Sequence, residues 1–259
     1  MIPKTHQVAL AVARVTFSEV IRDKILYNII LLAVLLFGVS ILASQLSFIT
    51  PERIILDFGM SAVNLSCSMI AIFTGSWLIG KEFERRTVFV ALSRPISRHQ
   101  FVLGKYLGLM QVIALNWVLL SLLLSGLLLL TGGTFNPTLI TGLFLFLLQS
   151  LVLGSLALMV SSFTTTSLSV IICIGFYLIG NNISQIRSVA DQSKSDSAKA
   201  VLKGLALILP NLEHFTLGTK VTYGLPVTGA FVATATGYAF VLSAFCLICA
   251  GIFLKRKEQ

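Results

Sequence analysis

Six stretches of the sequence contain no Asp, Glu, Lys, Arg or His, and this feature constrains the fold more than any other. They lie at about residues 25–46, 58–80, 106–130, 139–161, 168–180 and 229–254. A helix of about 20 apolar residues crosses the hydrocarbon core of a bilayer. Charged residues make up only 11% of the chain, whereas soluble domains carry about 25%. The sequence therefore predicts an all-α polytopic membrane protein with six transmembrane helices in one domain, residues 1–259.

The basic residues predict how these helices are oriented. With six spans both termini lie on one side, which holds thirteen Lys and Arg, against six on the other side. Since cytoplasmic loops carry the excess of basic residues, both termini and residues 81–105 are expected in the cytoplasm, and residues 181–228 outside it. The formal net charge of +9 is explained by this topology, so nucleic acid is not expected as a partner.

Two amphipathic helical segments are predicted outside the spans. Within residues 1–24, apolar residues recur at helical spacing opposite a charged face, a pattern typical of a helix lying in the membrane interface. A helix buried against other protein is the alternative. Between the fifth and sixth spans, a similar stripe over 198–209, ended by Pro210, predicts an extracytoplasmic helical segment.

Residues 81–105 interrupt the apolar sequence with eight charged side chains. Glu82 precedes Arg85 and Arg86 by three and four positions, which supports an exposed helix. Pro95 ends that helix, and a capping box of Ser97 and Gln100 begins the next one. A short cytoplasmic helix that turns through a defined corner into the third span is one interpretation; a charge cluster that only sets topology is the other.

What the predicted spans lack disfavours several classes of function. Proton- and ion-coupled carriers usually keep an ionisable group near the middle of the membrane, and no predicted span contains one. The sequence also lacks Gly-x-Ser-x-Gly, His-Glu-x-x-His and a phosphate-binding loop ending in Gly-Lys-Ser/Thr. We therefore expect no catalytic residue and no metal site, and we do not expect this chain to be an enzyme by itself.

A resemblance to a known family favours the first interpretation, in which residues 81–105 form a short cytoplasmic helix and a defined corner. The motifs that carry it are GKEFERRT (80–87), LSRPISR (92–98), FVLGK (101–105), LPNLE (209–213) and YGLPV (223–227). They resemble the permease subunits of type-2 ABC transporters. Within that family they are most similar to the branch named for multicopper-enzyme maturation, which includes the permease of the nitrous oxide reductase assembly system.

The resemblance implies a half-transporter that pairs with a second copy of itself and binds a separate cytoplasmic ATPase, which holds the ATP and Mg²⁺. No cofactor is expected in this chain. The residues implied to dock on the ATPase are Glu82, Glu84, Arg85, Arg86, Thr87, Leu92, Ser93, Arg94 and Pro95. Spans two and five are implied to flank the translocation path, with Ser61, Asn64, Ser68, Gly75, Asn181 and Asn182 as candidates along it.

The resemblance further implies a location in the bacterial cytoplasmic membrane and allows for an extracytoplasmic accessory protein. The substrate and the direction of transport do not follow from it. Two other functions remain open at this point: a channel or carrier that works alone, and a membrane assembly factor for an extracytoplasmic enzyme that transports nothing.

Overall fold

The computed structural model describes residues 5–45, 51–84, 98–131, 136–192, 199–200, 202, 204, 209–217, 221 and 225–257. Over these residues the protein consists of helices and connections without any strand. The helices are α1 (Thr5–Ile21), α2 (Lys24–Gln45), α3 (Pro51–Glu84), α5 (Arg98–Leu130), α6 (Pro137–Ser161), α7 (Thr166–Gly180), α8 (Ile183–Gln192) and α11 (Gly229–Lys257), with one 3-10 turn, η1 (Glu213–Phe215). The predicted all-α class is confirmed for the described residues.

Four helices contain stretches that are long and apolar enough to cross a membrane. These stretches are Glu52–Lys81, His99–Leu130, Pro137–Ser161 and Gly229–Leu254. A fifth candidate arises if α7 and α8, which are bent by 69° at their junction, form one span, and α2 contributes the shorter apolar helix Ile29–Gln45. The protein is therefore a multi-pass membrane protein, while the count of six spans stays a prediction.

Helix α6 occupies the centre of the bundle. It contacts α3, α5, α7 and α11, and most of its residues are buried on all sides. A helix that is apolar around its whole circumference is expected to be surrounded by other helices. By contrast, α2 and α11 leave large apolar side chains exposed on their outer faces, for example Leu42 and Val241. That distribution suits a bundle whose outer helices face lipid.

Proline residues begin two of the long helices. Pro51 is the first residue of α3, as the sequence predicts, because proline lacks the N–H that would have no partner in a first turn. Pro137 begins α6, where Asn136 stands at the capping position without a side-chain hydrogen bond to the helix. The position of this start is thus set by the proline, without a side-chain cap.

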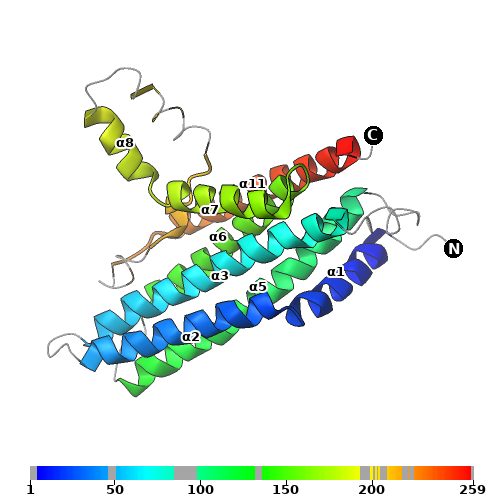
Figure 1. The fold of residues 1–259 in the computed structure, drawn as a ribbon. Coiled ribbons are helices and arrows are strands. Elements are labelled where there is room, and N and C mark those ends of the chain that lie inside the picture. Colours follow the sequence, from blue (N-terminus) through cyan, green and yellow to red (C-terminus); the bar gives the residue numbers. More distant parts are fainter. Residues whose placement is uncertain are drawn as a thin grey trace.

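Several helix ends meet at one end of the bundle, called here the α3–α5 end because α3 ends and α5 begins there. Figure 1 shows α1 beginning and α11 ending at this same end. Close contacts join its elements: Gly251 of α11 packs against the ring of His99, and Phe163 lies 5.0 Å from Phe253 between ring centroids. The end of α3 and the start of α5, which flank residues 85–97, therefore lie at the same end of the bundle as the beginning of α1 and the end of α11.

Helix α1 lies along the first half of α5. A Cβ atom at Gly104 would lie 3.0 Å from the carbonyl oxygen of Ala9, and one at Gly108 would lie 2.9 Å from that of Ala13. Contacts in the same order along both helices mean that α1 runs beside α5 and in the same direction. The two glycines permit this close approach. The face of α1 that contacts α5 thus agrees with the alternative interpretation of residues 1–24, a helix packed against other protein. The interfacial position of the opposite face stays a prediction.

The connection between α7 and α11 contains the helical elements α8 and η1. Glu213 of η1 accepts hydrogen bonds from the backbone N–H and the hydroxyl of Ser184, in the first turn of α8. A carboxylate is favourable at a helix N-terminus, where N–H groups lack partners. Helix α8 is a separate helix that precedes the stripe predicted over 198–209. That stripe lies largely outside the described residues, but its described residues 199, 200, 202 and 204 are helical.

Candidate functional site

Two of the predicted docking residues lie at the α3–α5 end. Glu82 and Glu84 belong to the last turn of α3, but their side chains lie outside the described residues. The other seven, from Arg85 to Pro95, lie wholly outside them. The predicted corner is likewise undescribed, although α5 begins at Arg98, directly after the predicted capping residue Ser97. The structure describes the two helices on either side of this segment, α3 and α5, which are called its frame here.

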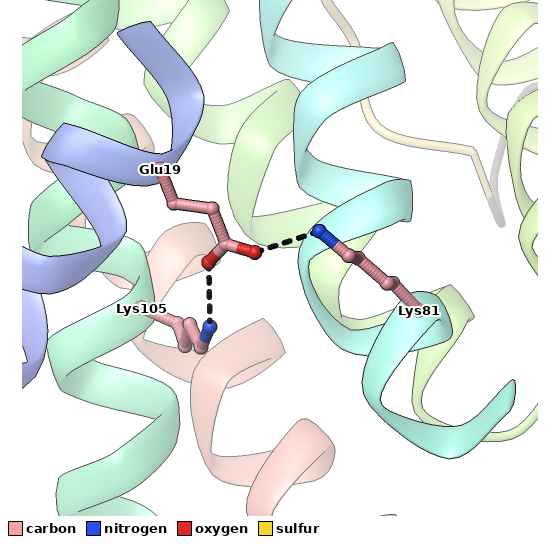
Figure 2. A network of polar contacts seen from close by, with 3 residues as sticks. All are labelled: Glu19, Lys81 and Lys105. Carbon is pink, nitrogen blue, oxygen red and sulfur yellow. Dashed lines mark hydrogen bonds and ion pairs between the residues drawn. The ribbon is translucent and has the colours of Figure 1, made fainter. Parts of the chain in front are cut away.

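An ionic cluster of Glu19, Lys81 and Lys105, called here the Glu19 cluster, forms part of that frame (Figure 2). Lys81 Nζ donates a hydrogen bond to Glu19 Oε1 at 2.9 Å, and Lys105 Nζ lies 3.7 Å from Glu19 Oε2. Figure 2 shows the carboxylate between the two ammonium groups, with each residue on a different helix. One side chain of α1 therefore binds the last turns of α3 and the first turns of α5 together.

The cluster is partly screened from water. The side chain of Lys105 is only 6% exposed, whereas those of Lys81 and Glu19 are 22% and 32% exposed. Burial raises the pKa of Glu19, but the hydrogen bond from Lys81 and the positive charges of Lys105 and Lys81 outweigh burial, so the pKa lies below its ordinary value. Glu19 is therefore ionised at neutral pH and holds both lysines by charge.

The two lysines stand at the edges of the apolar runs. Lys81 directly follows the predicted span 58–80, and Lys105 directly precedes the predicted span 106–130. The Lys81 ammonium also lies 3.8 Å from the centroid of the Trp77 ring, one turn earlier on α3. Lysine and tryptophan are both enriched at membrane–water boundaries. The Glu19 cluster therefore stands at the predicted edge of the apolar layer.

A second polar site lies where α3 meets α2 and α7, in a groove of about 530 Å³ called here the α3–α7 groove. Its lining consists of Leu36, Asp57, Phe58, Ser61, Asn64, Leu65 and Tyr177. Two of the predicted path residues, Ser61 and Asn64, thus stand on one face of α3. The groove combines apolar walls with hydroxyl, amide and carboxylate groups, which suits an amphipathic guest better than a bare ion.

The other two path candidates on α3 lie deeper. Ser68 is fully buried and donates a hydrogen bond to Asn64 Oδ1 at 3.3 Å, so it supports the amide that lines the groove. Gly75 lies in the contact between α3 and α6, where a Cβ atom would stand 2.8 Å from Cβ of Ala157. Within this chain Gly75 therefore serves helix packing, and it does not line the α3–α7 groove.

Asn181 and Asn182 lie at the bend between α7 and α8. The Asn181 amide oxygen accepts hydrogen bonds from Gln149 Nε2 at 3.0 Å and from Thr216 Oγ1 at 3.1 Å. Its amide nitrogen donates to the carbonyl of Tyr177 in the last turn of α7. Asn182 is exposed and donates to the carbonyl of Leu178. Asn181 thus fixes the bend against α6 and the η1 segment, while Asn182 faces outward.

Sequence reasoning missed several members of these sites. Glu19 stands on the charged face predicted for residues 1–24, but nothing in the sequence assigns lysines 62 and 86 positions away as its partners. Asp57 and Tyr177 lie outside the pattern of small polar residues on the second span, and Gln149 lies inside an apolar run. The one signal in the sequence was this single glutamine in the predicted fourth span, because a buried amide requires hydrogen-bond partners.

Comparison with known families gives one result that covers almost the whole chain. The family model described as ABC-2 family transporter protein matches residues 10–254. The matched region includes the Glu19 cluster, the residues predicted to dock on an ATPase and the α3–α7 groove. A search of curated proteins found no significant match.

Proposed function

Because the chain belongs to the ABC-2 transporter family, whose model matches residues 10–254, we propose that it is the permease subunit of an ABC transporter driven by a separate ATPase. The family match is the observation that carries this proposal. ATP and Mg²⁺ are bound by the ATPase, and this chain receives the resulting movement. It would act in the bacterial cytoplasmic membrane with both termini in the cytoplasm, where thirteen of its nineteen Lys and Arg residues would lie.

We assign the docking of the ATPase to Glu82, Glu84, Arg85, Arg86, Thr87, Leu92, Ser93, Arg94 and Pro95. The frame around this segment supports the assignment, because the Glu19 cluster holds both helices that flank it. A force applied between Glu84 and Arg98 would therefore reach α1, α3 and α5 together. Transmission of movement requires elements that shift as rigid bodies, and charge-assisted contacts among three helices favour such a unit.

We place the path for the transported group along α3 and α7. The α3–α7 groove supports this placement, since it contains Ser61 and Asn64 and is open on one side of the single chain. A second copy of the chain would close that side. Ser68 would hold Asn64 in position, and Asn181 and Asn182 would stand where the path meets the α7–α8 bend. Gly75 would contribute through the packing of α3 on α6.

Co-purification tests the proposal directly. Extraction of the chain from its native membrane in mild detergent is expected to recover an ATP-hydrolysing protein. The double variant Arg86→Glu/Arg94→Glu should lose that protein, because both reversals fall in the proposed dock. Arg53→Glu/Arg187→Glu reverses the same charges on α3 and α8, away from the α3–α5 end, and should retain it. Equal recovery with both double variants would overturn the assigned dock.

The result of ATP hydrolysis can be either export of a substrate or force applied to an extracytoplasmic partner. The narrower resemblance to the multicopper-enzyme-maturation branch favours a partner protein outside the cytoplasm. Reconstitution of the chain with its ATPase in vesicles distinguishes the two outcomes. ATP-dependent loss of a co-purified compound from one side indicates export, whereas ATP-dependent release of a bound protein without flux indicates force transmission. Flux without nucleotide would instead identify a channel.

A further inference from the structure

An open cleft of about 880 Å³ lies between α1 and the last turns of α3. Its lining, which defines the α1–α3 cleft, consists of Arg14, Val15, Ser18, Glu19, Arg22, Asp23, Trp77 and Lys81. It adjoins the Glu19 cluster, but most of its lining takes no part in that cluster. The opening exists because the small residues of α1 pack on α5, which leaves the opposite face of α1 directed away from the bundle.

One face of α1 supplies the first wall of the cleft. Arg14 and Ser18 stand one turn apart on the same side of α1, and Arg22 directly follows the end of that helix, four residues after Ser18. Both arginines are exposed, and among the residues that the structure describes neither of them forms an ion pair. Their guanidinium groups are therefore available to an anion held over Ser18.

Two side chains of α3 supply the second wall. Trp77 and Lys81 stand one turn apart, with the ammonium 3.8 Å from the ring centroid. Val15 stands at the rim with 66% of its surface exposed. An apolar residue and a tryptophan beside basic side chains form a surface that is apolar on one flank and cationic on the other. Side chains of this kind are typical of the headgroup region of a bilayer.

The charge in and beside the cleft is positive. Arg14, Arg22, Lys81 and the adjacent Lys105 carry four positive charges, and Glu19 and Asp23 carry two negative ones. Glu19 is already held by both lysines, and Asp23 also has an interaction within the protein. Glu19 is thus compensated from within the structure, and with Asp23 counted the four basic residues still leave a net positive charge that can attract an anion from outside.

We propose that the α1–α3 cleft binds the phosphate headgroup of an anionic phospholipid. Arg14 and Arg22 would bind the phosphate, the Ser18 hydroxyl would donate a hydrogen bond to it, and the acyl chains would leave along Val15 and Trp77 toward the apolar layer. Arginine suits this role because its planar fork binds two phosphate oxygens at once. Basic clefts between helices on the cytoplasmic side are typical lipid-headgroup sites.

A membrane lipid fits the cleft better than free phosphate for a positional reason. Lys81 directly follows the predicted span 58–80, so the cleft opens at the level where lipid headgroups lie. The exposed apolar surface of Val15 would gain nothing from an inorganic anion, but it would be covered by an acyl chain. The inference is independent of the proposed ATPase, since it requires only that the bundle is embedded in a bilayer.

Native mass spectrometry of the purified chain tests this inference. The protein is exchanged into detergent containing equal amounts of dioleoyl-phosphatidylglycerol and dioleoyl-phosphatidylcholine, and the retained lipids are counted. We expect a preference for phosphatidylglycerol that falls about tenfold in Arg14→Gln/Arg22→Gln, because each basic residue contributes to anionic lipid binding. Arg53→Gln/Arg187→Gln removes two arginines elsewhere and should keep the preference. Trp77→Phe should reduce it less than the arginine variant does.

Three outcomes would overturn the inference. Equal retention of both lipids by the unmodified chain means that the cleft does not select an anionic headgroup. An equal loss in Arg14→Gln/Arg22→Gln and in the control means that only the overall charge matters. Complete displacement of phosphatidylglycerol by millimolar inorganic phosphate means that the site takes a free anion. Recovery of the ATPase in each preparation shows separately whether the proposed function holds.

Discussion

The two sides of α3 are held by different chemistry. Toward α1 and α5, the last turn of α3 is fixed by the Glu19 cluster, in which one carboxylate contacts two ammonium groups. Toward α6 and α7, α3 is held by small and uncharged residues: Gly75 against Ala157, Ser76 against Ser169, and Gly80 against Thr166. The first contact depends on opposite charges at defined positions. The second depends on the close packing of small, uncharged residues.

This difference bears on how the bundle can move. Charge-assisted contacts resist separation, because a partly buried charge that loses its partner pays the full cost of desolvation. Hydrogen bonds between membrane helices, such as that of Ser169 to Ser76, contribute about 0.6 kcal/mol each on average, so they can be exchanged for neighbouring ones. We infer that α1, the end of α3 and the start of α5 move together, and that α3 shifts against α6 and α7.

The largest expected effect comes from filling the uncharged contact. Gly75→Leu should reduce the free energy of unfolding by about 3 kcal/mol, at the upper end of the usual range for overpacked cores. The physical reason is that even the Cβ atom would stand 2.8 Å from Cβ of Ala157 and 3.4 Å from Leu109 Cδ2. Thermal unfolding of the purified protein in detergent measures the change.

Gly126→Leu is the matched control for that substitution. It places the same side chain in α5, where no atom lies within 4 Å of the added Cβ. Leucine is also a better helix former than glycine, so this variant should be unchanged or slightly more stable. A similar loss of stability in both variants would show that glycine itself is required in the membrane helices, and not the close contact of α3 with α6.

The next effect comes from the charged contact. Glu19→Gln should cost roughly 1–2 kcal/mol, less than a fully buried ion pair would because Glu19 is about a third exposed. The loss should concentrate in α1, since the neutral amide no longer holds that helix to Lys81 and Lys105. Hydrogen exchange in α1 is therefore expected to accelerate more than exchange in α6.

Glu52→Gln serves as the comparison for this variant. It removes the same charge from the first turn of α3, at the opposite end of that helix from Lys81, where an acidic side chain interacts favourably with the helix dipole. Exchange in α1 should not respond to it. If Glu52→Gln accelerates exchange in α1 as much as Glu19→Gln does, the Glu19 cluster does not hold α1.

The same contact should weaken in acid. Since the pKa of Glu19 is lower in the folded protein than its ordinary value of 4.5, its contribution to stability is complete above that value. The contribution is lost as pH falls through the lower, folded-state pKa. The difference in stability between the unmodified protein and Glu19→Gln should therefore be constant near neutral pH and shrink below pH 4.5. A difference that does not change down to pH 3 would exclude an ionised Glu19 as its source.

The apolar runs predict where the long helices lie because the bilayer imposes their composition. They do not predict where each helix ends. Helix α3 is 34 residues long and extends beyond the predicted span on both sides, which carries Asp57 to the groove and Lys81 to the cluster. Hydropathy measures the thickness of the apolar layer, whereas a helix continues until its backbone or a residue such as proline stops it.

The partners of individual side chains were the least predictable feature. The spacing of Gly104 and Gly108 predicts a close helix contact, but only the fold identifies α1 as the partner. Topology accounts for the charges of Lys81 and Lys105 without any contact to Glu19. The predicted docking segment is a local sequence pattern, so the sequence could propose it; the frame around it depends on residues brought together from three distant helices.

The smallest expected effect tests whether the uncharged contact is as exchangeable as its chemistry indicates. Ser169 Oγ donates to Ser76 Oγ at 2.9 Å, and the Ala157 carbonyl lies 3.5 Å away as a second acceptor. A double-mutant cycle of Ser76→Ala and Ser169→Ala should therefore give a coupling of about 0.6 kcal/mol or less. The cycle of Glu19→Gln and Lys81→Met should give a larger value in the same unfolding assay. If the serine pair couples as strongly as the ion pair, α3 is locked on both sides, and movement between α3 and α7 must have another basis.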